Sequence, residues 1–209
     1  MALFRQTVLS TAYLPPIEYF FAAASGGKVL IEQCEIYQKQ SYRSRCRIYS
    51  AAGAESLSIP ILRDVTHKIP IRDVRIDYSE PWLQQHERAM IAAYKSSPFF
   101  DYYMDDIFRI LDARENFLFD LNTKLLEKLL ALVGLKADIG FTQEYVQEYP
   151  EGDFRTRIQP KYRGESLLEE YKKEKTYYQV FSSKSGFIPN LSIIDLLSEE
   201  GPNAISYIL

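Results

Sequence analysis

The chain has 209 residues, 46% of them hydrophobic and 25% charged, and its 25 basic and 28 acidic side chains give a net charge of −3. A chain of this length and composition can bury a core without disulfides or a metal. The charge balance excludes a global basic field for nucleic acid, and no apolar run approaches the roughly 20 residues of a membrane span.

The N-terminal part predicts a strand, a helix and a second strand. TVLS (7–10) is short and apolar, IEYFFAAA (17–24) has helical spacing before two glycines, and KVLIEQ (28–33) is rich in β-formers. Such a βαβ unit pairs its two strands in parallel. The turn STAYLPP (10–16) then lies at the carboxyl end of the sheet, where open α/β sheets bind ligands.

Extended segments and then helices follow. Residues 41–49 alternate strictly and return through 57–61 as a hairpin, and residues 71–78 alternate again as a further strand. Apolar residues at helical spacing then predict three helices, over 81–97, 99–113 and 122–135.

The C-terminal part predicts a charge-rich connection and one more helix. Residues 147–175 are rich in charge, Gly and Pro and are expected to form a long loop, or a lid that orders on ligand binding. TYYQVF (176–181) predicts a strand, and a helix follows with Asn190 as its N-cap. The whole predicts a single α/β domain over 1–209, with a mixed sheet built around the N-terminal βαβ unit, a hairpin and covering helices.

The stretch YQKQSYRSRCR (37–47) carries cations at alternate positions: Lys39, Arg43, Arg45 and Arg47. Alternate side chains of a strand face the same way, so one cationic face is predicted. One interpretation is an exposed hairpin face whose charges pair with acids on the next strand. The other is an anion site, because arginine binds phosphate or carboxylate through a planar fork.

Four further side chains, together with Lys39, are candidates for roles in a site around this stretch. Tyr13 in the first βα turn and Tyr37 beside the cationic run could contact a ligand. Glu35 or His86 could act as a general base, and Lys39 could neutralise developing charge. The two histidines of the chain are isolated and predict no metal site, and the sequence contains no Gly-rich phosphate loop.

Several stretches together resemble the WbqC-like protein family. They are STAYLPPIEYF, VLIEQCEIYQKQSYRSRCRI, LSIPI, Trp82–His86, the AAYKSSPFFDYY block and FIPNLSIIDLL. The resemblance spans nearly the whole chain and looks closest to the branch of Bacteroidetes-type bacteria. Many members have Gln-Pro where this chain has Ser10-Thr11, and an Asn-Arg-Asn-Arg-like run where it has residues 44–47.

The resemblance implies a transferase in the synthesis of O-antigen, capsule and similar bacterial surface polysaccharides. Such an enzyme would act on a phosphate-bearing sugar donor or acceptor, for instance by acyl or aminoacyl transfer. A non-catalytic anion- or sugar-binding or assembly subunit of the same pathway is the alternative. A nucleotidyltransferase-like enzyme is a further one, although its HxGH pair is absent at 15–19. The matched family positions are Tyr13, Pro15, Tyr37, Lys39, Arg43, Arg45, Arg47, His86, Asn190 and Asp195.

The expected partner is a small anionic molecule such as a phosphate or a nucleotide-sugar, and not a nucleic acid. Cys34 and Cys46 lie in or near predicted strands and are interpreted as core residues. The N-terminal residues lack the long apolar run of a signal peptide, so a cytoplasmic location is expected. The sequence specifies no cofactor and leaves self-association open.

Overall fold

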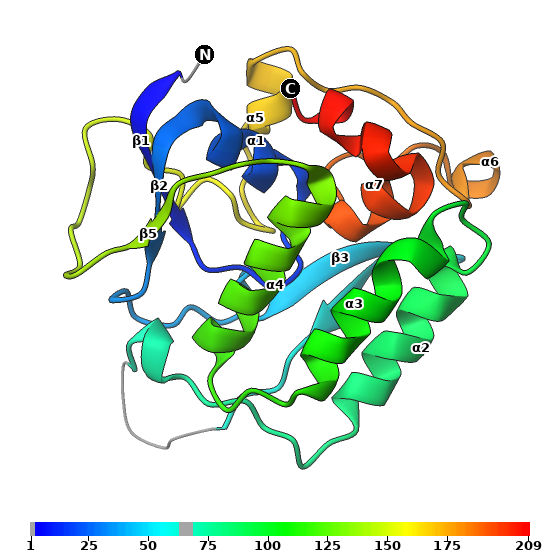
Figure 1. Cartoon of the computed structure of the whole chain (residues 1–209), viewed down its shortest axis with the longest axis horizontal. Coiled ribbons are helices and arrows are strands. Elements are labelled where there is room, and N and C mark those ends of the chain that lie inside the picture. The colour runs from blue at the N-terminus through cyan, green and yellow to red at the C-terminus, as the bar shows by residue number, and fades with distance from the viewer. Residues whose placement is uncertain (1–2, 63–68) are drawn as a thin grey trace.

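A parallel sheet with one crossover helix forms the N-terminal half of the fold. The computed structural model describes residues 3–62 and 69–209. In it, β1 (Phe4–Ser10), β2 (Gly26–Glu32) and β5 (Ile139–Phe141) lie in the order β1-β2-β5, all parallel. Helix α1 (Ile17–Ser25) connects the first two strands, which confirms the predicted βαβ unit (Figure 1).

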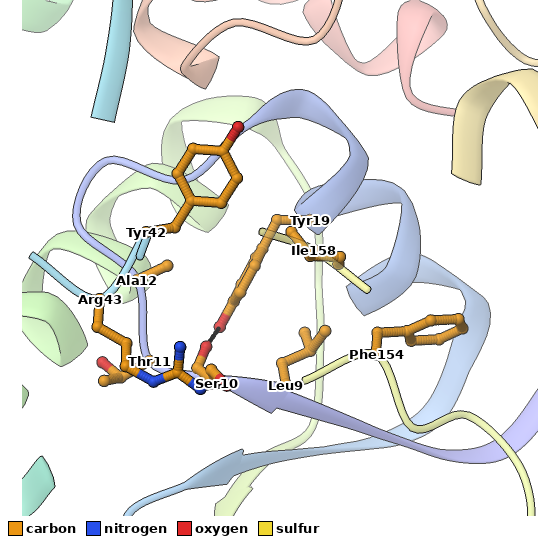
Figure 2. A pocket seen from close by; sticks show the side chains of 9 residues that line it. All are labelled: Leu9, Ser10, Thr11, Ala12, Tyr19, Tyr42, Arg43, Phe154 and Ile158. Atoms are coloured by element: carbon orange, nitrogen blue, oxygen red, sulfur yellow. Dashed lines mark hydrogen bonds between the residues drawn. The ribbon is translucent and has the colours of Figure 1, made fainter. Parts of the chain in front are cut away.

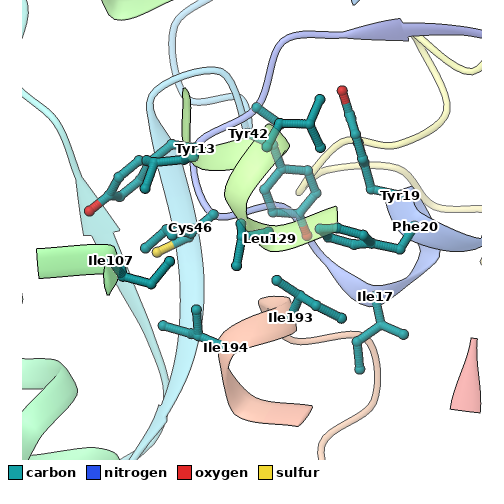
Figure 3. Close-up of a cluster of buried hydrophobic side chains, with 14 of the residues drawn as sticks. Tyr13, Ile17, Tyr19, Phe20, Tyr42, Cys46, Ile107, Leu129, Ile193 and Ile194 are labelled. Carbon is teal, nitrogen blue, oxygen red and sulfur yellow. The ribbon is translucent and has the colours of Figure 1, made fainter. Parts of the chain in front are cut away.

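The predicted hairpin is present as a separate two-stranded sheet. Strands β3 (Arg45–Ser50) and β4 (Gly53–Ser58) are antiparallel, with Ser50 paired to Gly53 across a tight turn. Cys46 and Ile48 of β3 are fully buried and belong to the hydrophobic core, in which Figure 3 shows Cys46. The α/β fold class is confirmed, although the parallel and antiparallel strands form two sheets and not one mixed sheet.

The longer helices lie around the hairpin and complete the core. They are α2 (Trp82–Tyr94), α3 (Phe100–Asp112), α4 (Leu118–Val133) and α7 (Ile193–Glu200) (Figure 1). Helix α4 begins four residues before the predicted start and ends at Val133. It is capped by Gly134, whose φ of 78° is the left-handed conformation that favours glycine. The short elements are η1 (Ile71–Asp73), α5 (Leu167–Glu170), α6 (Ser182–Ser185) and η2 (Gly201–Tyr207).

Two predicted strands are wrong. The segment 71–78 begins with the single turn η1 and then makes only isolated bridges, of Ile76 with Ile61 and of Arg75 with Phe117. The segment 176–181 is irregular in structure. Tyr177 and Gln179 of this segment are buried, whereas Thr176 and Tyr178 are exposed.

The second of these segments is fixed by side chains and not by a ladder. The Tyr177 hydroxyl and the Gln179 amide both donate to Oδ2 of Asp195 in α7, at 2.5 and 2.9 Å. Burial raises the pKa of Asp195, and these hydrogen bonds partly offset that rise. Asp195, one of the matched family positions, therefore lies in a buried structural network.

Asn190 caps a different helix from the one predicted. Ser192, and not Asn190, precedes α7. The Oδ1 atom of Asn190 instead accepts a hydrogen bond of 3.0 Å from the backbone N–H of Glu18 in the first turn of α1. Helix α1 follows Pro16, which offers no side-chain cap, so a residue distant in sequence supplies one.

Residues 147–175 are irregular apart from α5, but they are not wholly solvated. Phe154, Ile158 and Leu167 are buried in the core. The backbone of Asp153 forms a parallel bridge with Val8, so this part of the chain passes beside β1 (Figure 1). Apolar side chains thus anchor a segment whose charges suggested a solvated loop.

In the part of the chain that the structure describes, no helix combines the length and the apolar character required to cross a bilayer.

Candidate functional site

The turn after β1 has an unusual backbone at the carboxyl edge of the parallel sheet. Leu14 has a φ of 41°, a left-handed conformation that is rare for a side chain of this size. The strain is held in place because Ser192 Oγ donates to the Leu14 carbonyl at 2.7 Å and Tyr13 N–H donates to the Tyr42 carbonyl at 2.8 Å. Such strain is concentrated at functional sites, which directs attention to this turn.

A small cavity lies beside the turn. Its volume is about 10 Å³, which is room for about one water molecule. Figure 2 shows Arg43 at one end of it and Phe154 and Ile158 at the other. Its lining residues are Leu9, Ser10, Thr11, Ala12, Tyr19, Tyr42, Arg43, Phe154 and Ile158.

The Arg43 guanidinium is buried and held by a carboxylate. Arg43 is 2% exposed, and its Nε and Nη2 donate to the two carboxylate oxygens of Glu35 at 2.8 and 2.5 Å. Nη2 also donates to Ser10 Oγ at 2.7 Å. Among the described residues, Nη1 has no hydrogen-bond partner. The pair is neutral overall, and it leaves one donor nitrogen for a ligand.

The predicted row of four cations is wrong. Strand β3 begins only at Arg45, and the chain turns at Tyr42 and Arg43, so Arg43 leaves the face of Arg45 and Arg47. Lys39 is exposed in the preceding turn.

Among the residues that the structure describes, no carboxylate neutralises the two arginines of β3. Both are half-buried on one face of the strand, and Arg45 Nε donates to Ser58 Oγ at 3.1 Å. Within residues 3–62 and 69–209, neither forms an ion pair with an acidic side chain. Burial raises the pKa of Tyr42, and the neighbouring Arg47 guanidinium offsets part of the rise. Arg47 therefore lies beside a tyrosine that lines the cavity.

A second buried charge cluster lies at the end of β2, and it was not predicted. Arg155 Nη1 donates to Glu32 Oε2 at 2.9 Å, and Nε and Nη2 donate to the two oxygens of Asp153 at 2.9 and 2.6 Å. The rings of Tyr145 and Tyr149 lie 5.3 and 5.0 Å from the guanidinium carbon. Residues 32 and 155 are far apart in sequence. The one sequence feature that could have indicated this cluster is Glu32, a carboxylate at the C-terminal end of an apolar strand.

Tyr13 and His86 contact each other and do not line the cavity. The Tyr13 hydroxyl lies 2.9 Å from His86 Nδ1, and both side chains are buried. Figure 3 shows Tyr13 among the core side chains. Burial lowers the pKa of His86 to about 4, and a hydrogen bond with the Ser58 backbone partly offsets this. Tyr37 lies apart, with its hydroxyl 2.7 Å from Ser44 Oγ.

The lowered pKa of His86 predicts a pH-dependent stability. Between about pH 6.5 and pH 4 the unfolded chain takes up a proton that the folded protein excludes, so this contribution to the free energy of unfolding is lost as the pH falls. The loss is up to about 3 kcal/mol across that window.

Urea unfolding of the wild type and of His86→Gln at several pH values measures it. Asp195 and Glu18 have raised pKa values and act in the opposite direction, so the difference between the two proteins is the informative quantity. We expect the wild type to lose more stability than His86→Gln between pH 6.5 and pH 4. Equal losses would contradict a neutral, buried His86.

The parallel sheet with its crossover helix defines an α/β protein, and its carboxyl edge holds the strained turn and the buried arginine. The chain belongs to the WbqC-like protein family, whose model matches residues 11–169. It is similar to the uncharacterized protein Rv1507c of Mycobacterium tuberculosis, with 24% identity over 228 residues that cover 98% of this chain and 97% of that protein. No solved structure matches it.

Proposed function

We propose that this protein is a cytoplasmic transferase of bacterial surface-polysaccharide synthesis that binds a phosphate-bearing sugar at the carboxyl edge of β1. The observation that carries the proposal is the Arg43 guanidinium, buried at the first βα turn with its Nη1 free among the described residues and adjoining a cavity. A guanidinium donor that adjoins a cavity can donate to an oxygen of a bound ligand. The resemblance to the WbqC-like family supports the pathway.

The charges of the arginines suggest which part of the ligand each of them would contact. Because Glu35 neutralises Arg43, Nη1 suits a neutral oxygen such as a sugar hydroxyl. Arg45 and Arg47 retain their charge at the half-exposed face of β3 and suit a phosphate. Tyr42 connects the two regions, because it lines the cavity and lies beside Arg47.

One observation favours the alternative of a binding subunit without catalysis. Both candidate general bases are engaged: the two oxygens of Glu35 accept hydrogen bonds from Arg43, and His86 is buried against Tyr13. A mass-spectrometric assay for acyl or aminoacyl transfer to a bound sugar nucleotide separates the two functions. Product formation supports the transferase, and binding without product supports the subunit.

Binding itself is tested by thermal unfolding with nucleotide-sugars, sugar phosphates, coenzyme A and pyrophosphate. A ligand at 100 times its Kd adds about 2.7 kcal/mol of stability, which corresponds to a rise in Tm of several degrees. Arg47→Ala removes one charged contact and is expected to weaken binding at least tenfold, since such hydrogen bonds contribute about 1.5–3 kcal/mol.

Arg88→Ala is the matched control, because Arg88 is an exposed arginine on α2. It should bind as the wild type does. If none of these compounds raises the Tm of the wild type, or if both variants behave alike, the proposed phosphate site is wrong.

A further inference from the structure

We propose that residues 154–163 form a lid closed over the cavity, and that the Glu32–Arg155–Asp153 cluster is the latch that holds it shut. The inference concerns access to the site and rests on the proposed function only for the identity of what enters. It makes specific the expectation of a lid within residues 147–175.

The small volume of the cavity indicates that the lid is closed in this structure. A space of about 10 Å³ admits one water molecule, whereas a sugar ring needs several times that volume. Leu9, Ser10 and Tyr19 belong to the sheet and its crossover helix and cannot withdraw without disrupting them. Phe154 and Ile158 come from an irregular segment and close the end opposite Arg43 (Figure 2). Tyr42 and Arg43 also lie in a turn, but a backbone hydrogen bond from Tyr13 and the ion pair with Glu35 hold them, so the segment of Phe154 and Ile158 is the part that we expect to move.

The segment has a fixed pivot on the strand side. Val8 N–H donates to the Gly152 carbonyl at 2.8 Å, and Phe154 N–H donates to the Val8 carbonyl at 3.0 Å. These two bonds extend the sheet beyond β1 and fix the start of the lid. Motion would therefore begin after the backbone of Phe154.

Beyond the pivot, the buried attachments are the apolar side chain of Ile158 and the charged side chain of Arg155. The other side-chain contacts of the lid are exposed pairs, such as Gln159 with Gln38 at 3.4 Å and Lys161 with Gln40 at 2.5 Å. Exposed contacts of this kind contribute little to stability. Arg155 is 5% exposed, so its ion pair with Glu32 is the buried polar contact that holds the lid.

The latch can open at one ion pair. Asp153 holds Arg155 through two hydrogen bonds and can keep it neutralised when the lid moves. Glu32 retains two other donors, Thr142 Oγ1 at 2.7 Å and the Cys34 N–H at 2.8 Å. Opening breaks the 2.9 Å contact between Arg155 and Glu32 and the 3.3 Å hydrogen bond from Arg155 Nη2 to the Gln147 carbonyl, and it leaves neither charged group without a partner.

Hydrogen exchange of the ligand-free protein, followed by mass spectrometry, tests the latch. In Arg155→Gln, amides of the 154–163 peptide should exchange at least tenfold faster than in the wild type, whereas peptides from β1 and α4 should be unchanged. Arg109→Gln is the control, because Arg109 forms an exposed pair with Asp106 on α3. It should leave the lid peptide as in the wild type.

A second variant, Glu32→Gln, tests the latch if Arg155→Gln does not fold. Glu32→Gln keeps the shape and the acceptor oxygen that Thr142 and Cys34 use but removes the charge that holds Arg155. Faster exchange confined to 154–163 in either variant supports the latch. Unchanged exchange in a folded variant, or acceleration spread equally over β1 and α4 in both, overturns it.

Adding a nucleotide-sugar separates this inference from the proposed function. Protection of 154–163 by the compound supports a lid that closes on ligand. A lid that loosens in the variants while no compound binds any of the proteins leaves the latch standing and overturns the proposed function.

Discussion

Replacing Glu35 by glutamine is expected to lower the free energy of unfolding by about 3–5 kcal/mol, because it leaves the buried Arg43 charge uncompensated. Arg43 is 2% exposed, and Glu35 holds it through two hydrogen bonds of 2.8 and 2.5 Å. Asp101→Asn is the control, since Asp101 pairs with Lys95 on the surface, and there the loss should stay below about 1 kcal/mol. Urea unfolding measures both, and similar small losses would contradict a tightly held buried pair.

Replacing both members of the pair by apolar residues separates stability from binding. An Arg43→Met, Glu35→Leu double variant should recover most of the lost stability, because a buried ion pair is often no more stabilising than well-packed apolar side chains. Under the proposed function it should also lose stabilisation by a nucleotide-sugar. A double variant that still binds as the wild type does would assign the pair a structural role alone.

Gly152→Ala is expected to destabilise the protein by more than about 3 kcal/mol, because backbone strain and a steric clash act together. Gly152 has a φ of 68°, and a Cβ at this position would lie 2.1 Å from the backbone carbonyl oxygen of Gln6. Since that atom belongs to β1, the clash cannot be relieved by rotating a side chain.

Gly53→Ala provides the matched control for Gly152→Ala. Gly53 has a φ of 103°, and a Cβ there would meet nothing within 4 Å, so only the conformational strain applies. We expect a loss of about 1–2 kcal/mol by urea unfolding. Equal losses in the two variants would show that the chain at Gly152 does not press against β1.

The sequence predicted the elements that depend on the residue pattern within a single short segment of the chain. The βαβ unit follows from two short apolar strands around an apolar helical run, and the hairpin from alternation on both sides of a turn. The strand expected from alternation at 71–78 is absent, because an irregular segment lying on the core can also bury apolar side chains at intervals, here Ile71, Val74 and Ile76. The strand expected at 176–181 is absent as well. A strand also requires a partner, and the partner is not encoded in the segment itself.

The sequence placed the first βα turn beside the cationic run, but it did not predict how the arginines are arranged. The first βα turn and Arg43 do adjoin one cavity. The shared face of Arg43, Arg45 and Arg47 assumed one unbroken strand, and a turn at Tyr42 and Arg43 breaks that parity.

The buried partners of the site depend on tertiary folding. Glu35 lies eight residues before Arg43, and Glu32 lies 123 residues before Arg155. A separation of that kind carries no periodicity that a single sequence could reveal. The second charge cluster could therefore be recognised only from the fold.

The most direct test of the ligand site is an NMR titration of the 15N-labelled protein with a nucleotide-sugar. Binding at the carboxyl edge of β1 predicts saturable shifts of the amides of Thr11, Ala12 and Arg43. The groove of about 210 Å³ that includes Tyr78 and Arg114, at the start of α2, should be unaffected. Shifts confined to that groove, or no saturable shift anywhere, would contradict the assignment of the ligand site to the Arg43 cavity.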